Sequence, residues 1–480
     1  MSSVAIEQET YPMWIAGEPV TAAQSRRIEI PFDGMPVATV YEADPAIVER
    51  AITTALKASQ AMRALTQYER AELLERIREG LKRNSAEFSR LVCWETGKPI
   101  REARAEVERS LQTLLQSADE ARRLHGEVVP MEAAPIGKGR YAITVREPLG
   151  AIGAITPFNV PLNLALHKVA PALAAGNSVV HKPASNTPLS ALRLARLVTE
   201  AGAPPGAYNV VTGGGRRVGS QIASDPRLAM VTFTGSVPVG EAIRASAGLR
   251  RVTLELGANS AVIIEPDADL DMIVPRCVTG SFSHSGQICI SVQHIYVQER
   301  IADLFTERLV AGAKALKIGS PLEEATDISS LITVSEAERV ERWTSEAVRR
   351  GAHILTGGKR ERSTIEPTVL TDVPDDLDIS CREAFGPVVI VHRYRELAAA
   401  IDEVNSSQYG LQAGVCTRDI GKAFDAARRL EVGGVMINDV PTFRADHMPY
   451  GGVKKSGIGR EGPRYAIEEM TELKLICWRG

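Results

Sequence analysis

The sequence predicts an α/β protein with two parallel-sheet domains and a smaller β arm. Short apolar segments alternate with helix-prone ones from residue 151 onward, and a second alternation of the same kind begins after residue 256. Two further strand-like segments, at 124–145 and near the C-terminus, belong to neither series. The length of 480 residues exceeds what one hydrophobic core usually organises, which also indicates two or three domains.

The residues before the first series form two segments, a helix-prone one followed by an extended one. Residues 45–121 are charged and helix-prone up to and beyond a Gly-Lys-Pro break at Gly97, which predicts a helical lead-in. The apolar residues that repeat there at helical spacing are Leu73, Leu74, Ile77 and Leu81. Residues 124–145 then read GEVVP and RYAITV, extended segments bounded by Gly and Pro that indicate a hairpin or an inter-subunit arm.

The first series has the pattern of strands joined by crossover helices, for instance at 190–201. Its apolar segments are 151–156, 178–181, 208–211 and 230–233. Ligands of open parallel sheets bind at the carboxyl ends of the strands, where TPFN, HKPAS, TGGG and TGS fall. These four segments are therefore candidates for function.

The second series predicts another domain of similar architecture. Its strand-like segments are 261–265, 294–298, 387–394 and 433–439, and its helix-like segments are 270–280 and 301–316. The chain ends in the apolar, strand-like LKLICW at 473–478, which is suited to pairing with the 124–145 arm.

Composition and charge exclude several classes of protein. Hydrophobic residues make up 44% and charged residues 24%, as in ordinary globular proteins. The net charge of −3 argues against a nucleic-acid partner. The six cysteines lack disulfide or metal-ligand spacing, so we expect no metal site and a reducing compartment. Since we find no signal pattern and no apolar run of about 20 residues, we expect a cytoplasmic protein without a membrane partner.

Two segments carry residues suited to covalent chemistry. GQICIS places Cys289 in a polar turn that starts with glycine, unlike the inert cysteines of apolar runs. LELGANS lies 34 residues upstream and contains Glu255 between two leucines, which would bury the carboxyl group and raise its pKa toward that of a general base. Together they form a candidate pair of nucleophile and base.

Seven motifs occur in one order along nearly the whole chain, and together they resemble the aldehyde dehydrogenase superfamily. The motifs are TPFN (156–159), HKPAS (181–185), FTGSVPVG (233–240), LELG (254–257), GQIC (286–289), EAFGP (383–387) and PYGGVKKSGIGREG (449–462). The resemblance implies the aldehyde dehydrogenase fold, with a Rossmann-like coenzyme domain, an α/β catalytic domain and a small β oligomerisation arm. We expect the coenzyme domain at 1–123 and 146–254, the catalytic domain at 255–455, and the arm at 124–145 and 456–480.

The same resemblance implies an NAD(P)-dependent oxidation of an aldehyde to the carboxylic acid. Cys289 would add to the aldehyde carbon, because an aldehyde releases hydride readily only after a nucleophile has added to it. Asn159 and the backbone N–H of Cys289 would hold the resulting alkoxide, and Glu255 would activate the water that hydrolyses the thioester. The alternatives are a CoA-acylating aldehyde dehydrogenase, which commonly lacks this glutamate, and a non-catalytic structural relative.

The coenzyme, NAD or NADP, would be held mainly at the strand ends, with Lys182 on the adenosine ribose, Ser236 on the pyrophosphate and Glu383 on the nicotinamide ribose. The full set of expected coenzyme contacts is Thr156, Pro157, Phe158, Lys182, Ser185, Gly215, Gly219, Phe233, Thr234, Gly235, Ser236, Gly240, Leu256, Gly257, Glu383 and Phe385. Ser185 stands where NAD-preferring members often carry a glutamate, so NADP is admissible, with Arg216 or Arg217 as further partners.

EVERS around Arg109, GQICISVQ and VPTFRADHMPYGG are most similar to the lactaldehyde and phosphonoacetaldehyde dehydrogenase-like branch. We therefore expect a small, polar aldehyde substrate, with Arg109 and Arg444 able to hold a substrate anion. The alternative is that Arg109 pairs with a glutamate such as Glu106 while Arg444 braces its loop. The expected substrate contacts are Arg109, Asn159, Ile288, Ser291, Arg444 and His447. The arm implies a homodimer or homotetramer.

Overall fold

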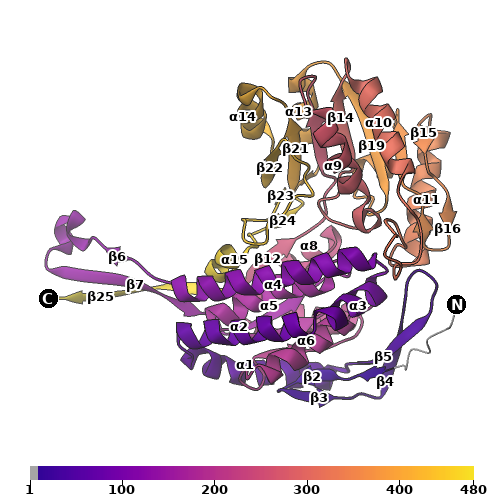
Figure 1. Ribbon diagram of the computed structural model, residues 1–480. Helices are drawn as coiled ribbons and strands as arrows, with labels where there is room; N and C mark the ends of the chain where they lie inside the picture. The colour runs from indigo at the N-terminus through magenta and orange to yellow at the C-terminus, as the bar shows by residue number, and fades with distance from the viewer. Residues whose placement is uncertain (1–8) are drawn as a thin grey trace.

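The computed structural model describes residues 9–480 and contains two large open sheets, the helices packed on them, and a projecting arm (Figure 1). In Figure 1 the second sheet lies above the first, and the arm extends to the left from the first. The predicted α/β class with a β arm is confirmed. Residues 1–8 lie outside the described part of the chain.

The helical lead-in is confirmed as four helices, α1 (Pro45–Ala64), α2 (Gln67–Arg83), α3 (Ser85–Thr96) and α4 (Ile100–Arg123). A capping box between Thr66 and Glu69 begins α2, and Gly97 ends α3 in the left-handed conformation, with a φ of 71°. The four predicted apolar residues of α2 are at most 2% exposed. Both α2 and α4 pack against α5 (Pro161–Ala175), which is buried along its whole length.

The first sheet has eight strands in the order β24-β12-β11-β8-β9-β10-β2-β3. Its parallel strands are β8 (Ala151–Ile155), β9 (Ser178–Lys182), β10 (Tyr208–Val210), β11 (Met230–Thr234) and β12 (Arg251–Glu255). The four predicted strands are confirmed, with α6 (Leu189–Glu200) as a crossover helix. Three antiparallel strands were not predicted: the edge strands β3 (Glu18–Val20) and β24 (Gly457–Ile458), and β2 (Met13–Ile15) between β10 and β3.

The second sheet has seven strands in the order β15-β18-β19-β14-β13-β21-β22, all parallel except the edge strand β15 (His353–Thr356). The predicted elements appear as β13 (Ala261–Ile264), α9 (Leu270–Phe282), β14 (His294–Gln298), α10 (Ala302–Lys314), β19 (Val388–Tyr394) and β22 (Gly434–Ile437). The prediction missed β18 (Thr368–Thr371), β21 (Gln412–Cys416), α11 (Val334–Arg349), α13 (Leu397–Ser406) and α14 (Ile420–Arg429).

The arm is a three-stranded antiparallel sheet of β6 (Val128–Val129), β7 (Arg140–Pro148) and β25 (Thr471–Arg479). Pairing runs from Thr471 opposite Pro148 to Arg479 opposite Arg140, so the expected pairing of the C-terminal tail with the arm is confirmed. Within the range 456–480 assigned to the arm, β24 pairs with β12 and α15 (Pro463–Glu469) packs on α5. The division of the chain into domains stays a prediction.

Candidate active site

Cys289 lies in a loop that follows a sharp turn of the chain after α9. His284, Ser285 and Gly286 have φ values of 48°, 53° and 72°, three consecutive residues in the left-handed region. A Cβ on Gly286 would lie 2.1 Å from the carbonyl oxygen of Gly386, so only glycine fits there. Strained backbone of this kind persists where the surrounding structure holds it, and it is common at functional sites.

The sulfur of Cys289 contacts a buried tyrosine. Its Sγ lies 2.8 Å from the hydroxyl oxygen of Tyr450, and the guanidinium carbon of Arg444 lies 3.6 Å from the centre of the Tyr450 ring. Burial raises the pKa of the Cys289 thiol to about 11, although the Tyr450 hydroxyl and the Arg444 charge both act to lower it. Tyr450 was not among the predicted site residues.

Glu255 is the last residue of β12 and is 3% exposed. Neither of its carboxyl oxygens has a hydrogen-bond partner among the described residues. Burial raises the pKa of this carboxyl well above its ordinary value, and the nearby charge of Glu461 raises it further. A buried carboxyl without a partner has the properties of a base that accepts a proton near neutral pH.

Glu461 is part of a buried ion cluster beside Glu255. It accepts hydrogen bonds from Lys168 Nζ at 2.7 Å and from Arg444 at 3.0 Å. Burial acts to raise the pKa of Glu461, but Lys168 and Arg444 outweigh burial and lower the pKa to about 2. The negative charge of Glu461 therefore favours the protonated form of the neighbouring Glu255.

Asn159 reaches the nucleophile loop from the first sheet. It follows β8, is 3% exposed, and donates through Nδ2 to the carbonyl oxygen of Gln287 at 2.9 Å. A side-chain amide carries two N–H groups, so one remains beyond this bond. Asn159 and Cys289 were predicted to act together. The structure brings them close, Asn159 from a loop of the first sheet and Cys289 from the loop after α9.

Most predicted coenzyme residues lie at one edge of the first sheet, because parallel strands end on the same side. Thr156 follows β8 and Lys182 ends β9, while Phe233, Thr234, Gly235 and Ser236 end β11 and lead into α8 (Val237–Ala247). Ser236 caps α8 at its N-terminus. Lys182 donates to its neighbour's carbonyl at 2.8 Å, and its buried position lowers its pKa to about 8.

Contacts join the remaining coenzyme residues to this edge. A Cβ atom added at Gly219 would lie 3.4 Å from Lys182, one at Gly240 2.5 Å from Leu256, and one at Gly257 2.7 Å from Glu383. A Cβ atom added at Gly215 would meet no atom within 4 Å. Phe158, after Pro157, meets Phe385 edge to face with ring centres 5.6 Å apart. Ser185 donates to Gly213 O at 3.0 Å.

Glu383 completes the nicotinamide side of the predicted coenzyme site. It accepts a hydrogen bond from the backbone N–H of Ala258 at 3.1 Å, and burial raises its pKa to about 7. The hydroxyl of Thr234 is buried without a partner among the described residues. Buried polar groups without a partner, and glycines that leave space beside the backbone, lie at the carboxyl ends of the strands and fit a dinucleotide. When bound, the dinucleotide would supply a hydride acceptor.

Arg109 lies on α4 and forms a two-pronged ion pair with Asp446, at 2.7 and 3.2 Å. The expected alternative partner was wrong, because Glu106 pairs with Lys98 at 2.5 Å. Asp446 also accepts from Asn163 at 2.9 Å and contacts His167 at 3.0 Å. The Arg109 side chain remains 38% exposed, so it has room for a further partner.

The other predicted substrate residues differ in their surroundings. Arg444 is buried against Tyr450 and Glu461, and His447 is exposed on the same loop. Ile288 is half-buried beside Cys289. The Ser291 hydroxyl lies 3.2 Å from the carbonyl oxygens of both Gly280 and Ser281, at the end of α9.

The prediction missed Tyr450, Glu461, Asp446, Lys168 and His167. Tyr450 and Glu461 lie within the quoted motif 449–462, so the motif was found but not its side-chain roles. Lys168 and His167 lie in α5, an apolar helix whose polar residues give no pattern of their own. Only the pairing of α5 with a segment far along the chain identifies them.

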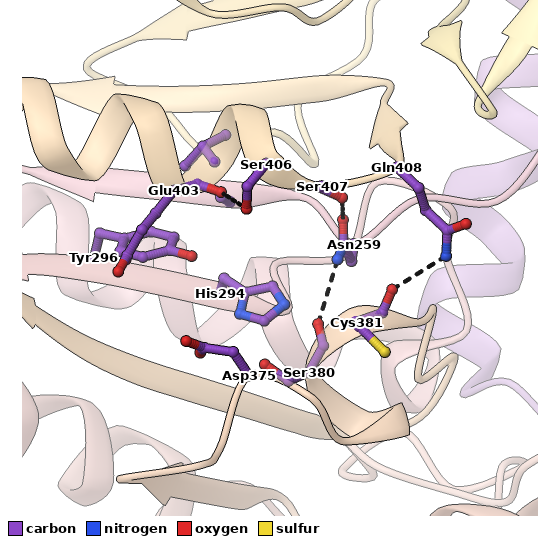
Figure 2. A pocket seen from close by; sticks show the side chains of 12 residues that line it. Asn259, His294, Tyr296, Asp375, Ser380, Cys381, Glu403, Ser406, Ser407 and Gln408 are labelled. Atoms are coloured by element: carbon purple, nitrogen blue, oxygen red, sulfur yellow. Dashed lines mark hydrogen bonds between the residues drawn. The ribbon is translucent and has the colours of Figure 1, made fainter.

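A cavity of about 350 Å³ opens between α13 and the second sheet, away from Cys289 (Figure 2). Asn259 bridges it, accepting from the Ser407 hydroxyl at 2.7 Å and donating to Ser380 O at 3.4 Å. Both ends of the Asn259 side-chain amide are therefore occupied by hydrogen bonds in this cavity.

Residues 9–480 contain no cluster of three or more His, Cys, Asp or Glu side chains able to hold a metal ion. Over the same residues, no helix combines the length and apolar character needed to cross a bilayer.

Known proteins resemble this chain over nearly its whole length. The aldehyde dehydrogenase family model matches residues 20–476. The 3-sulfolactaldehyde dehydrogenase of Priestia aryabhattai is 48% identical over 97% of both chains. Aldehyde dehydrogenase 21 of Physcomitrella patens, solved with the reaction product succinate, has a TM-score of 0.97 at 40% identity and covers 99% of each chain.

The glyceraldehyde-3-phosphate dehydrogenase GapN of Methanocaldococcus jannaschii, solved with NADP, has a TM-score of 0.91 at 41% identity, over 95% of this chain and all of that one. The matches confirm the fold and the use of NAD or NADP that the seven motifs implied. They also confirm the lactaldehyde-like branch inferred from the segments around Arg109, after Gly286 and near the C-terminus. This chain belongs to the aldehyde dehydrogenase family and is an oxidoreductase that acts on aldehydes.

Proposed function

We propose that this chain oxidises a small aldehyde with an anionic group to the corresponding carboxylic acid. The observation that carries the proposal is a fixed cation beside the nucleophile: Arg444 lies on the ring of Tyr450, whose hydroxyl contacts Cys289. Arg109 lies near the same loop through Asp446. The names of the relatives support an anion, since sulfolactaldehyde carries a sulfonate, glyceraldehyde 3-phosphate a phosphate and succinate two carboxylates.

The local charges favour an anion as well. Arg109, Arg444 and Lys168 face the carboxylates of Asp446 and Glu461, so three formal cations meet two formal anions. A charge-assisted hydrogen bond from the half-exposed Arg109 to a substrate anion would contribute roughly 1.5–3 kcal/mol.

The residues divide the chemistry between two steps. The Cys289 thiolate adds to the aldehyde carbon, and the alkoxide oxygen is held by the second N–H of Asn159 and the backbone N–H of Cys289. Loss of hydride from this adduct leaves a thioester, and bound NAD or NADP supplies the hydride acceptor. Glu255 then takes a proton from water as the water oxygen attacks the thioester carbon, and cleavage of the C–S bond releases the acid and the Cys289 thiolate.

The coenzyme-binding part, 1–123 with 146–254, would hold NAD or NADP along the strand ends. Lys182, Ser236 and Glu383 would bind the adenosine ribose, the pyrophosphate and the nicotinamide ribose. NADP use is supported by Ser185 and by the exposed Arg216 and Arg217 nearby, because no carboxylate at residue 185 would repel a 2′-phosphate.

Two rival functions differ from this one in a measurable way. A CoA-acylating enzyme would pass the acyl group from Cys289 to a thiol, but the buried, unpartnered Glu255 is suited to activating water. A non-catalytic relative would have no use for Cys289, Glu255 and Asn159 in one place. Catalysis by a thiol also requires a reduced Cys289, which supports the cytoplasm as the compartment.

The test is an aldehyde panel followed by coenzyme absorbance, with each coenzyme and with or without CoA. Lactaldehyde, succinic semialdehyde and phosphonoacetaldehyde should exceed hexanal and benzaldehyde in kcat/KM, the free acid should form without CoA, and both coenzymes should be used. Arg109→Ala should lower kcat/KM for the anionic aldehydes by about tenfold or more, since 1.4 kcal/mol corresponds to tenfold.

The matched control is Arg104→Ala, on the same helix α4, which removes an exposed pair with Glu324. It should leave kcat/KM unchanged. A preference for the two apolar aldehydes, or an unaltered kcat/KM in Arg109→Ala, would rule out the anion site.

The arm supports a homodimer or homotetramer. The arm exposes a group of large apolar side chains, on its sheet and on the turn between β6 and β7, that a monomer would leave in water. They are Val128, Ile136, Tyr141, Leu473, Leu475, Ile476 and Trp478.

A further inference from the structure

The hydroxyl of Tyr450 has one hydrogen-bond partner among the described residues, the sulfur of Cys289. Tyr450 is 2% exposed and is among the largest side chains buried in the molecule. Its Oη lies 2.8 Å from Sγ, well within hydrogen-bonding distance for sulfur. The buried ring therefore holds the hydroxyl in a fixed position against the sulfur of the half-buried Cys289.

The surroundings decide which atom donates. A thiol is a weak donor and a phenol a strong one. Arg444 is always charged, and its guanidinium carbon lies 3.6 Å from the centre of the Tyr450 ring. This positive charge favours the thiolate form of Cys289 at the other end of the hydrogen bond. Burial holds the pKa of Tyr450 well above its ordinary value, so the phenol keeps its proton and can donate it.

We propose that the Tyr450 hydroxyl, with Arg444 behind its ring, donates a hydrogen bond to the Cys289 thiolate and so stabilises the reactive form of the nucleophile. The inference rests on the proposed role of Cys289. On ionisation the thiol proton passes to water, and Tyr450 keeps its own proton throughout. When sulfur bonds to the aldehyde carbon, its negative charge moves to the aldehyde oxygen, and the hydrogen bond from Tyr450 weakens.

Other charged or titratable groups also face the sulfur. Arg444 acts to lower the pKa of the Cys289 thiol, while Glu383 from the loop before β19 and Glu255 from β12 act to raise it. Burial raises the pKa of both carboxyl groups, which reduces the negative charge that they place near the sulfur. Burial of the sulfur itself is the largest opposing effect, which makes a strong donor at Sγ necessary.

The experiment measures the ionisation of Cys289 directly. Iodoacetamide alkylates thiolates, so its rate on the Cys289 peptide, followed by mass spectrometry across a pH series, reports the titration of this thiol. Tyr450→Phe keeps the ring for Arg444 and removes only the hydroxyl. We expect its alkylation midpoint to rise by about one pH unit and its rate near neutral pH to fall about tenfold.

The control is Tyr394→Phe, which removes a buried hydroxyl that donates to Glu265 in the second sheet. It should titrate as the wild type does, and thermal melting would show that both variants are folded. An unmoved or lowered midpoint in Tyr450→Phe overturns the inference. So does a rate that falls equally at every pH, which would indicate altered access to the sulfur.

Cys289→Ala separates this inference from the proposed function. If Cys289→Ala still oxidises aldehydes, the proposed function fails. If it is inactive while Tyr450→Phe titrates as the wild type, only the role of Tyr450 fails.

Discussion

At the scale of single residues, Glu255 and Cys289 serve different halves of the reaction. Glu255→Gln keeps the size of the side chain but removes the base, so the first turnover should proceed and the thioester should then accumulate. We expect a burst of reduced coenzyme equal to the enzyme present, followed by a steady rate lowered by about a hundredfold or more. Rapid mixing with coenzyme absorbance measures both phases. A wild-type steady rate in this variant would show that another group activates water.

The ion cluster around Glu461 makes a prediction about pH. Glu255 works as a base only without its proton, so kcat should rise with pH as this carboxyl ionises. Glu461→Gln removes a negative charge that raises the Glu255 pKa, so the acidic limb of kcat should move to lower pH. Lys168→Met removes a positive charge that lowers this pKa, so the limb should move to higher pH.

Glu461→Gln leaves Lys168 without a carboxylate partner, whereas Lys168→Met leaves Glu461 with Arg444 alone. Both should lose stability, the first by about 3–5 kcal/mol. General damage would therefore affect the two in the same direction, whereas the electrostatic effect has opposite signs. The pH profiles of kcat, measured below the melting temperature of each variant, separate the two. Shifts in the same direction would contradict the control of Glu255 by this cluster.

At the scale of elements, the turn before Cys289 depends on the loop that carries Glu383. An added methyl at Gly286 would meet the Gly386 backbone, which cannot move as a flexible side chain can. Gly286→Ala should cost about 2 kcal/mol or more in unfolding free energy, from crowding and left-handed strain together, and should displace Cys289. Gly202→Ala is the matched control, since its φ is also positive, at 85°, but no atom lies within 4 Å of the added Cβ.

Urea unfolding and kcat measure the two effects. Gly202→Ala should show only the cost of the backbone conformation, about 1–2 kcal/mol, with kcat unchanged. If Gly286→Ala behaves in the same way, the two loops are less tightly joined than their packing indicates.

Elements with a strong pattern were predictable, and those that depend on distant pairing were not. The buried strands β8, β9 and β11 are continuous apolar runs, and α2 has a helical repeat, so local sequence was sufficient. The two-residue strand β24 exists because it pairs with β12, about 200 residues earlier, and no local signal marks it.

The same contrast holds for the site. Motifs identified Cys289, Glu255 and Asn159, which the fold brings to one region. Arg109 was expected to bind a substrate anion or to pair with a nearby glutamate, whereas its partner, Asp446, is 337 residues away in sequence. Pairings across such separations depend on packing, which a single sequence does not contain.

At the scale of the whole molecule, the arm exposes apolar side chains on a sheet that projects from the body (Figure 1). Leu475→Asp places a charge on β25 at a residue that is 57% exposed, so it should weaken assembly while leaving the fold intact. Light scattering after size-exclusion chromatography should show a dimer or tetramer for the wild type and a smaller species for the variant. Leu249→Asp is the control, because Leu249 is fully exposed outside the arm. A monomeric wild type would refute the prediction.

The buried pair of Lys168 and Glu461 joins residues 293 positions apart, and this spacing matters while the protein is being made. A ribosome delivers the N-terminal part first, so α5 emerges long before the segment 457–470 that contains Glu461 and the whole of α15. Until that segment arrives, Lys168 has no carboxylate to pair with, β12 lacks its edge partner β24, and the pocket that buries Glu255 stays open. A nascent chain that already contains both Glu255 and Cys289 therefore still lacks the burial and the neighbouring charges that set the pKa of Glu255. Polypeptides released before residue 457 should neither oxidise aldehyde nor consume coenzyme.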